Sequence, residues 1–281
     1  MNCIRLTNER LEDLRTFLGQ KADANLFALG LLEDHGLRNT DGAPVKAYAL
    51  SGDGTSFETA VLVGGDGGLV LPAAASASAA EELGQALRGK ISVRSLFGPR
   101  RILDGFLKGL GAQDSVLLVR PLTVFAAAAD FLGPFVCPEL RRATVSDLPR
   151  LIPFAAKAVA ESLGEDPLTC TREAFERRIA ARVLAGRTYV LEREGTLALK
   201  LDVTSQSRFG LEIEGVFAAP KFRQKGLATL AVGQITRHML GRMPKIVARV
   251  PEGDEPATRL CRRVGFLPVR RSDETRLMIL R

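Results

Sequence analysis

The chain has 281 residues, of which 46% are hydrophobic and 25% charged. This length predicts one large or two smaller domains, and the composition is ordinary for a globular protein. No apolar run reaches the length of a membrane span and the N-terminus lacks a signal-peptide pattern, so we expect a cytoplasmic protein with no membrane partner. The four cysteines form no CxxC pair and the chain has only two histidines, so we expect no metal site.

The net charge of +7 is unevenly distributed. Residues 221–281 contain 14 Lys and Arg against 5 Asp and Glu, which leaves the preceding residues slightly acidic. The basic end predicts attraction for a polyanionic cofactor. Nucleic acid is a less favoured partner, because the chain has no Trp and two Tyr and therefore lacks a platform on which bases could stack.

The first half alternates short strands with helices. From apolar periodicity and turn residues we expect strands at 2–6, 46–50, 59–63, 68–71, 92–97 and 116–124. We expect helices after residue 10 and at 24–32, 78–88 and 100–110. Thr7 and Ser78 are the predicted N-caps of two of these helices.

Residues 126–138, rich in Ala, Gly and Pro, are typical of a connector, and the pattern then restarts. A strand, a threonine and an amphipathic helix follow one another after residue 139 as they do after residue 1, which indicates a weak internal repeat. We expect strands at 140–144, 188–192, 196–204, 211–218 and 245–250, and helices at 155–163, 173–184 and 255–264. Residues 266–270 and 276–280 are predicted to form a closing hairpin. The whole predicts an α/β fold, a mixed sheet with helices on both faces.

The most informative stretch is residues 216–229, where an apolar strand ends in a proline, a basic loop follows and a helix begins. The first amides of a helix have no partner within the helix, and the helix dipole makes that end partly positive. Phosphate groups therefore bind well at such a junction. Gly226 lets the backbone approach a ligand, Arg223 and Lys225 add positive charge, and Gln224 adds a donor. The stretch predicts a pyrophosphate cradle.

The spacing Arg223-x-x-Gly226-x-Ala228 resembles the Arg/Gln-x-x-Gly-x-Gly/Ala signature of GNAT-type N-acyltransferases. A second segment, residues 257–266, is similar to the Ala-x-x-Leu-Tyr-x-x-x-Gly-Phe segment near the C-terminus of that family. Together with the internal repeat, the resemblance implies two tandem GNAT-like domains. Residues 139–281 would hold the acyltransferase, and residues 1–133, which lack the signature, would be a degenerate copy.

The resemblance implies acetyl-CoA or another acyl-CoA as co-substrate, without a metal. It also implies that the backbone of Val216, Phe217 and Ala218 binds the pantetheine arm. The residues that would hold the pyrophosphate are Arg223, Gln224, Lys225, Gly226, Leu227, Ala228 and Thr229.

The implied reaction is direct attack of a primary amine on the thioester, which needs a base, a polarised carbonyl and a proton for the leaving thiolate. Glu212 and Glu214 are the candidate bases, because alternation along a strand puts them on one face with Val216 and Ala218. The alternative is a solvated or salt-bridged pair of strand carboxylates. The amides of Phe217 or Ala218 would polarise the carbonyl.

Cys261 stands where the family often has a tyrosine that protonates the thiolate. A thiol with a pKa near 8.5 can donate a proton, as a phenol near 10 does, so Cys261 is the candidate acid. The alternative is that Cys261 only fills the core and water supplies the proton. Asp254 stands where the family often has Asn. Glu161, Glu165 and Asp166 either receive a cationic amine or are solvated.

We therefore expect an N-acyltransferase that acts on a small-molecule or peptide amine. The alternative, favoured by the missing tyrosine, is a catalytically inactive CoA-binding sensor or scaffold. A third hypothesis is an aminoacyl transferase that uses charged tRNA, which the intact phosphate loop disfavours. The acceptor amine, the acyl length and the oligomeric state are left open.

Overall fold

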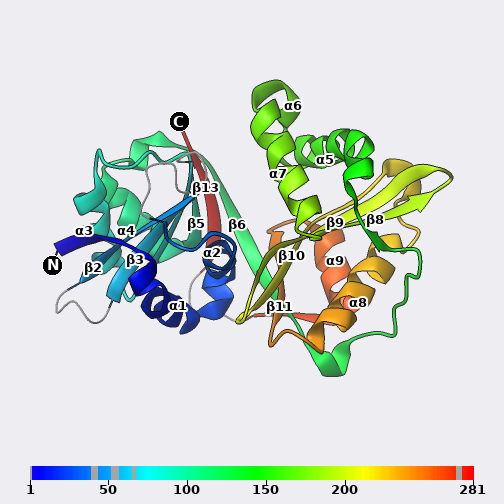
Figure 1. Ribbon diagram of the computed structural model, residues 1–281, viewed down its shortest axis with the longest axis horizontal. Coiled ribbons are helices and arrows are strands. Elements are labelled where there is room, and N and C mark those ends of the chain that lie inside the picture. The colour runs from blue at the N-terminus through cyan, green and yellow to red at the C-terminus, as the bar shows by residue number, and fades with distance from the viewer. Residues whose placement is uncertain (1, 39–43, 52–56, 65–67, 270–273) are drawn as a thin grey trace.

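The computed structural model describes residues 2–38, 44–51, 57–64, 68–269 and 274–281. Two lobes lie side by side, and one sheet of 13 described strands runs through both (Figure 1). The helices are α1 (Leu11–Gly19), α2 (Ala22–His35), α3 (Ala77–Leu87), α4 (Arg100–Leu110), α5 (Leu148–Leu163), α6 (Pro167–Cys170), α7 (Arg172–Leu184), α8 (Leu227–Leu240) and α9 (Glu255–Val264). None of these helices, which cover the described part of the chain, is long and apolar enough to cross a membrane.

The strands are β1 (Asn2–Leu6), β2 (Val45–Ser51), β3 (Phe57–Gly64), β4 (Leu69–Ala74), β5 (Ser95–Pro99), β6 (Val116–Ala127), β7 (Arg141–Arg142), β8 (Thr188–Arg193), β9 (Thr196–Ser207), β10 (Gly210–Ala218), β11 (Ile246–Pro251), β12 (Phe266–Pro268) and β13 (Thr275–Leu280). The predicted mixed α/β fold is confirmed, and α4 and α9 have the predicted bounds.

Of the predicted helix caps, Ser78 is wrong, and Thr7 holds the N-cap position without a capping hydrogen bond from its side chain in the described part of the structure. The side chain that caps α3 is Ser76, whose hydroxyl accepts a hydrogen bond from the amide of Ala79 at 3.2 Å, and not Ser78. Thr7 precedes a short 3-10 turn, and its side chain makes no capping hydrogen bond among the described residues. Thr144 holds the N-cap position of the turn before α5, and its amide donates to the carboxylate of Asp147 at 2.8 Å.

The two halves repeat the same strand order. The first half runs β1-β2-β3-β4-β5-β13-β6, and the second runs β7-β8-β9-β10-β11-β6 with β12 on the far side of β6. Each half has a parallel pair of strands at the corresponding place, β4 with β5 in the first half and β10 with β11 in the second. The helices fall between corresponding strands, so the weak repeat in the sequence reflects two copies of one architecture.

The closing hairpin predicted for residues 266–270 and 276–280 is wrong. Among the described residues, β12 and β13 both pair with β6 and not with each other. β13 instead crosses into the first half, where it lies between β5 and β6. The 12 residues of β6 are long enough to pair with β13 at one end and with β11 and β12 at the other (Figure 1). Each half is therefore completed by a strand from the other half. The division into domains 1–133 and 139–281 stays a prediction, to which this exchange of strands is added.

Helices cover both faces of the sheet in each half. In the first half α1 and α2 pack on one face and α3 and α4 on the other, and in the second half α5 and α7 lie opposite α8 and α9. Helix α2 also packs against β9 of the second half, where the hydroxyl of Ser205 donates to the carbonyl of Leu26 at 2.5 Å. A Cβ on Gly30 would lie 2.1 Å from that hydroxyl, so the close approach of helix and strand requires glycine.

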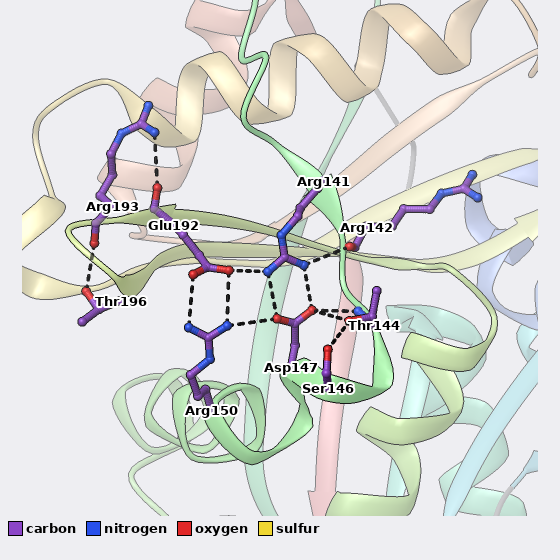
Figure 2. A network of polar contacts seen from close by, with 9 residues as sticks. All are labelled: Arg141, Arg142, Thr144, Ser146, Asp147, Arg150, Glu192, Arg193 and Thr196. Carbon is purple, nitrogen blue, oxygen red and sulfur yellow. Dashed lines mark hydrogen bonds and ion pairs between the residues drawn. The ribbon is translucent and has the colours of Figure 1, made fainter.

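A network of ion pairs fastens the start of α5 to the edge of the sheet (Figure 2). Asp147, with a side chain 3% exposed, accepts from Arg141 at 2.7 and 2.8 Å and from Arg150 at 3.2 Å. Both arginines also pair with Glu192 of β8. The hydrogen bonds from Arg141 hold the pKa of Asp147 well below its usual range.

We expect Asp147→Asn to lower the free energy of unfolding at pH 7 by about 2 kcal/mol, measured by urea denaturation. The loss stays below that of a fully buried pair because Arg141 and Arg150 are more than 40% exposed and water screens them. A carboxylate with a lowered pKa stabilises the fold above its ordinary value near about 4 and loses this effect as the pH falls. The difference between wild type and variant should therefore shrink below that pH. Asp104→Asn, which removes an exposed pair on α4, should change little, and an equal loss in both variants would contradict the prediction.

Candidate functional site

The segment between β10 and α8 has the shape of an anion-binding loop. After Ala218 a short 3-10 turn, Pro220–Phe222, leads to Gln224 and Gly226, whose φ angles are +60° and +76°. Gly226 is the N-cap of α8. A positive φ is costly for residues with a side chain, so Gly226 adopts it at little cost whereas the turn at Gln224 is strained.

The first turn of α8 is left open for a ligand. Within the described chain no side chain caps this turn and no acidic residue lies in it. A Cβ built on Gly226 would meet no described atom within 4 Å, so the space in front of the helix is open. Free amides, the positive helix end and open space together fit a phosphate group.

The three cations of the loop are anchored to their neighbours. Lys221 pairs with Glu194 at 3.1 Å, and the ammonium groups of Lys221 and Lys225 lie 4.6 and 5.4 Å from the ring centre of Phe222. Arg223 donates to the carbonyl of Ala218 at 3.0 Å. The positive charges therefore stay close to the open end of α8.

Arg223 also connects the loop to α5. Its guanidinium pairs with Glu161 at 2.6 Å and lies 5.3 Å from the ring centre of Phe217, which itself packs edge-on against Phe154. Glu161, one of the three acids considered for an acceptor amine, is thus engaged by Arg223. Of the other two, Asp166 caps α6 through the amide of Leu168 at 2.9 Å, and Glu165 is exposed.

β10 separates from β11 just before the loop. The two strands pair only over residues 211–213, so Glu214 is the first residue beyond the paired segment. The pairing of β10 with β9 gains one residue between Glu214 and Phe217, and Gly215 there has a φ of +57°. Beyond this bulge, the backbone of residues 216–218 on the side of β11 has no pairing with β11 in the described structure.

The bulge corrects the predicted face of β10. Glu214 is opposite Asp202 and Phe217 is opposite Lys200, two residues that share a face of β9. Glu214 therefore lies on one face with Phe217, and not with Val216 and Ala218 as simple alternation predicted. The inserted residue is the reason, because it shifts the alternation by one position.

The two candidate bases have different surroundings. Glu212 is fully buried and forms an ion pair with Arg249 of β11. Glu214 is partly exposed. Burial and the neighbouring charge of Glu212 raise the pKa of Glu214 to about 8, although Arg249 and Arg182 act in the opposite direction. Glu214 has both access to solvent and a raised pKa, which suits a base near neutral pH.

A second buried charge pair lies beside Glu214, and the sequence analysis missed it. Lys200 donates to Asp202 at 2.6 Å and to the carbonyl of Gly215 at 3.0 Å, and so holds the bulge in place. Asp202 also accepts from Thr188 at 2.8 Å and pairs with Arg182. These buried charges could have been found in the sequence, because charged residues interrupt strands that are otherwise apolar, at residues 196–207 here and at residues 246–251 in the strand of Arg249.

Cys261 lies in the core between the sheet and α8. It is 6% exposed, and burial followed by the charge of Asp254 raises its pKa to about 11. Asp254 caps α9 by accepting from the amide of Ala257 at 3.0 Å. The assignment of Cys261 as an acid stays a prediction, and its burial fits the alternative of core packing.

The equivalent junction in the first half has no cradle. β4 ends at Ala74 and α3 begins at Ala77, so only Ala75 and Ser76 connect them, where residues 219–226 connect β10 to α8. Ser76 already occupies an amide of the first turn. A cleft of about 920 Å³ lies at this junction, and Lys21, Asp23 and Lys245 are among the residues that line it.

The fold and the loop together define the class of protein. A bulged strand leaves its parallel neighbour and runs through a basic loop into an uncapped helix, an arrangement that fits a phosphate-bearing ligand beside a strand edge. Residues 139–267 match the family model of the acetyltransferase (GNAT) domain. These residues belong to the GNAT family, and the chain as a whole has the fold of tandem GNAT proteins.

Several solved structures are similar to nearly the whole chain, among them the following three. A tandem GNAT protein from the clavulanic acid biosynthesis pathway, solved without AcCoA, shares 13% identity at a TM-score of 0.60, with 99% of this chain and 97% of that chain covered. A GCN5-related N-acetyltransferase from Sphaerobacter thermophilus shares 15% at 0.61, with 98% and 94% covered. A Drosophila protein shares 15% at 0.70, with 99% and 98% covered. These identities show a common fold. A comparison with curated protein sequences gave no match.

Proposed function

We propose that this protein is a cytoplasmic N-acyltransferase that moves an acetyl or other acyl group from acyl-CoA to a primary amine of a small molecule or peptide. The observation that carries the proposal is that, among the described residues, the first turn of α8 has no side-chain cap and that the space around Gly226, in front of this turn, is open. Such a site suits the pyrophosphate of CoA. The fold supports acyl transfer from acyl-CoA in general, and the match of residues 139–267 to the GNAT domain supports a reaction in the second half.

The loop and β10 would each bind a different part of acyl-CoA. The amides at the start of α8, from Leu227 to Thr229, would bind the pyrophosphate, with Arg223 and Lys225 supplying charge. The open edge of residues 216–218 would bind the amide groups of the pantetheine arm as a neighbouring strand does. When bound, acyl-CoA supplies a thioester carbonyl as the electrophile.

Glu214 would take the proton of the attacking ammonium, directly or through a water. It lies at the point where β10 and β11 separate, on the strand that leads to the proposed pantetheine edge. The amides of Phe217 or Ala218 would donate to the carbonyl oxygen. We assign Glu212 to the support of this site, because it is fully buried and paired with Arg249.

The leaving thiolate needs no dedicated acid, because a thiolate of ordinary pKa can depart as the anion and take its proton from the solvent afterwards. A thiol with a pKa of about 11 would give its proton to a thiolate of ordinary pKa, near about 8.5, only against a free-energy difference. We therefore assign Cys261 to core packing. The absence of a tyrosine at this position keeps a CoA-binding sensor or scaffold as the second candidate function.

Thermal unfolding with acetyl-CoA, longer acyl-CoAs and free CoA tests the site. A ligand that binds only the native state raises the midpoint, by about 5 °C at a hundredfold excess over Kd. We expect this rise in wild type and its loss in Gly226→Glu, whose carboxylate would occupy the place of the pyrophosphate.

Gly89→Glu is a matched control, because Gly89 also has a positive φ of +72° and open space around its Cβ but lies in the first half. It should keep the full rise. The absence of a rise in wild type with every CoA tested would refute the proposed function. Binding without thiol release by any amine would favour the sensor.

A further inference from the structure

Arg249 of β11 connects the two halves beside the candidate base. Its side chain is 1% exposed and pairs with the fully buried Glu212. The guanidinium lies 4.8 Å from the ring centre of Phe97 and donates to the backbone carbonyl of Asp23 at 3.1 Å. A buried guanidinium requires such partners, because its removal from water is costly.

Phe97 and Asp23 both belong to the first half of the chain. Phe97 lies on β5, and its ring packs edge-on against Phe27 of α2 at 6.3 Å between centres. Asp23 lies in the first turn of α2, and its carboxylate pairs with Lys245, next to β11. The first half thus contacts Arg249 by a ring from one element and by a carbonyl from another.

The charge of Arg249 acts on Glu214. Glu212 lies two residues before Glu214 on the same strand and raises the pKa of Glu214, whereas Arg249 lowers it. The other charged groups around Glu214 are Asp202, Lys200 and Arg182. Lys200 and Arg182 both pair with Asp202, on the β9 side of β10. Arg249 lies on β11, which is the neighbour of β10 on the other side.

We propose that Arg249 is a positioning residue for Glu214 and that Phe97 and Asp23 hold it in place, so that the first half completes the reaction site of the second half. The inference rests on the proposed function for its role in acyl transfer, but the coupling itself is measurable without any acceptor. A first half that served only as a scaffold would not have to reach a charge beside the candidate base.

The test is a pH titration of Glu214 in the full chain by carbon-13 NMR of labelled glutamate carboxyl groups. Glu214→Gln identifies the resonance. Phe97→Leu removes the ring beneath Arg249 and leaves every charge in place. We expect the pKa of Glu214 to rise by at least about 0.5 in Phe97→Leu, because a displaced Arg249 lowers it less, and to fall in Glu212→Gln, which removes the like charge.

Phe57→Leu is the matched control, because Phe57 also lies beneath an arginine of the first half, Arg10 at 4.7 Å. It should leave the pKa of Glu214 within about 0.2 of wild type. Phe97→Met, which is closer in volume, replaces Phe97→Leu if thermal unfolding shows that the leucine variant is not folded.

An unchanged titration of Glu214 in a folded Phe97 variant would overturn the inference, and so would an equal rise in Phe57→Leu. Thiol-release assays separate this result from the proposed function. If Phe97→Leu shifts the titration while Glu214→Gln keeps full turnover, the coupling stands and the assignment of the base is wrong. If Glu214→Gln is inactive and the titration does not move, the base stands and the role of Arg249 is wrong.

Discussion

Glu214→Gln is expected to lower kcat/KM for the best amine of a panel by about 10²- to 10³-fold at pH 8.5. Glutamine keeps the size of the side chain but cannot take up a proton. In wild type the rate should rise with pH, reach half of its maximum near pH 8 and level off above about pH 9, because the pKa of Glu214 is about 8 and only the ionised carboxylate is a base. The measurement is thiol release as a function of pH, and the variant should lose this rising limb.

Glu173→Gln is the control for this experiment. Glu173 is also a carboxylate of the second half, but its side chain on α7 is 91% exposed. It should keep the rate and the pH profile of wild type. A Glu214→Gln variant with an unchanged rising limb would show that another group takes the proton.

The same substitution should raise stability. A carboxyl group with a raised pKa keeps its proton in the folded state while the unfolded chain releases it, so folding is penalised from about pH 4.5 upward, and the penalty is complete above about pH 8. Glu214→Gln removes that penalty. Its unfolding midpoint should exceed that of wild type at pH 8.5 and approach it at pH 5, a gain in stability that accompanies the loss of activity.

Deletion of residues 274–281, which contain β13, is expected to prevent folding of the whole chain, although the proposed site lies in the other lobe. β13 pairs with β5 on one side and β6 on the other, so its loss leaves two open edges inside the sheet. It also removes Met278 and Leu280, 2% and 6% exposed, from the core of the first half. At about 2–5 kcal/mol for each buried side chain, this loss approaches the total stability of an ordinary domain.

The measurement is circular dichroism with urea denaturation of the shortened protein. We expect no cooperative transition and a tendency to aggregate. Addition of a synthetic peptide of residues 274–281 should restore a cooperative transition, because that strand fills the slot between β5 and β6. Met278→Ala should stay folded with a loss of about 3 kcal/mol. A shortened protein that unfolds with the midpoint of wild type would contradict the prediction.

The local features of the site were within reach of the sequence. The start of α8 after Gly226 and the strand before Pro220 depend on residues that are neighbours in the chain, so propensity and turn chemistry determine them. The GNAT resemblance rested on these residues and is confirmed for residues 139–267. The roles of the individual site residues stay predictions.

The features that depend on distant contacts were missed. The pairing of β13 with β5 joins residues about 180 positions apart, and no local pattern at Thr275 favours it over a hairpin. The bulge at Gly215 depends on Lys200, which donates to its carbonyl from the next strand. Arg249 was given no role from the sequence, because its partners Phe97 and Asp23 lie in the other half of the chain.

The exchange of strands between the halves also bears on how the protein is made. A ribosome synthesises β5 and β6 first and β13 only after the entire second half. Until then the nascent first half has a gap in its sheet, with exposed edges and the apolar surface that Met278 and Leu280 later cover. Domains usually fold in the order of their synthesis. Here the first half has to wait for the second, so its folding is completed only after translation of the GNAT domain, and during that interval it is a natural client for chaperones.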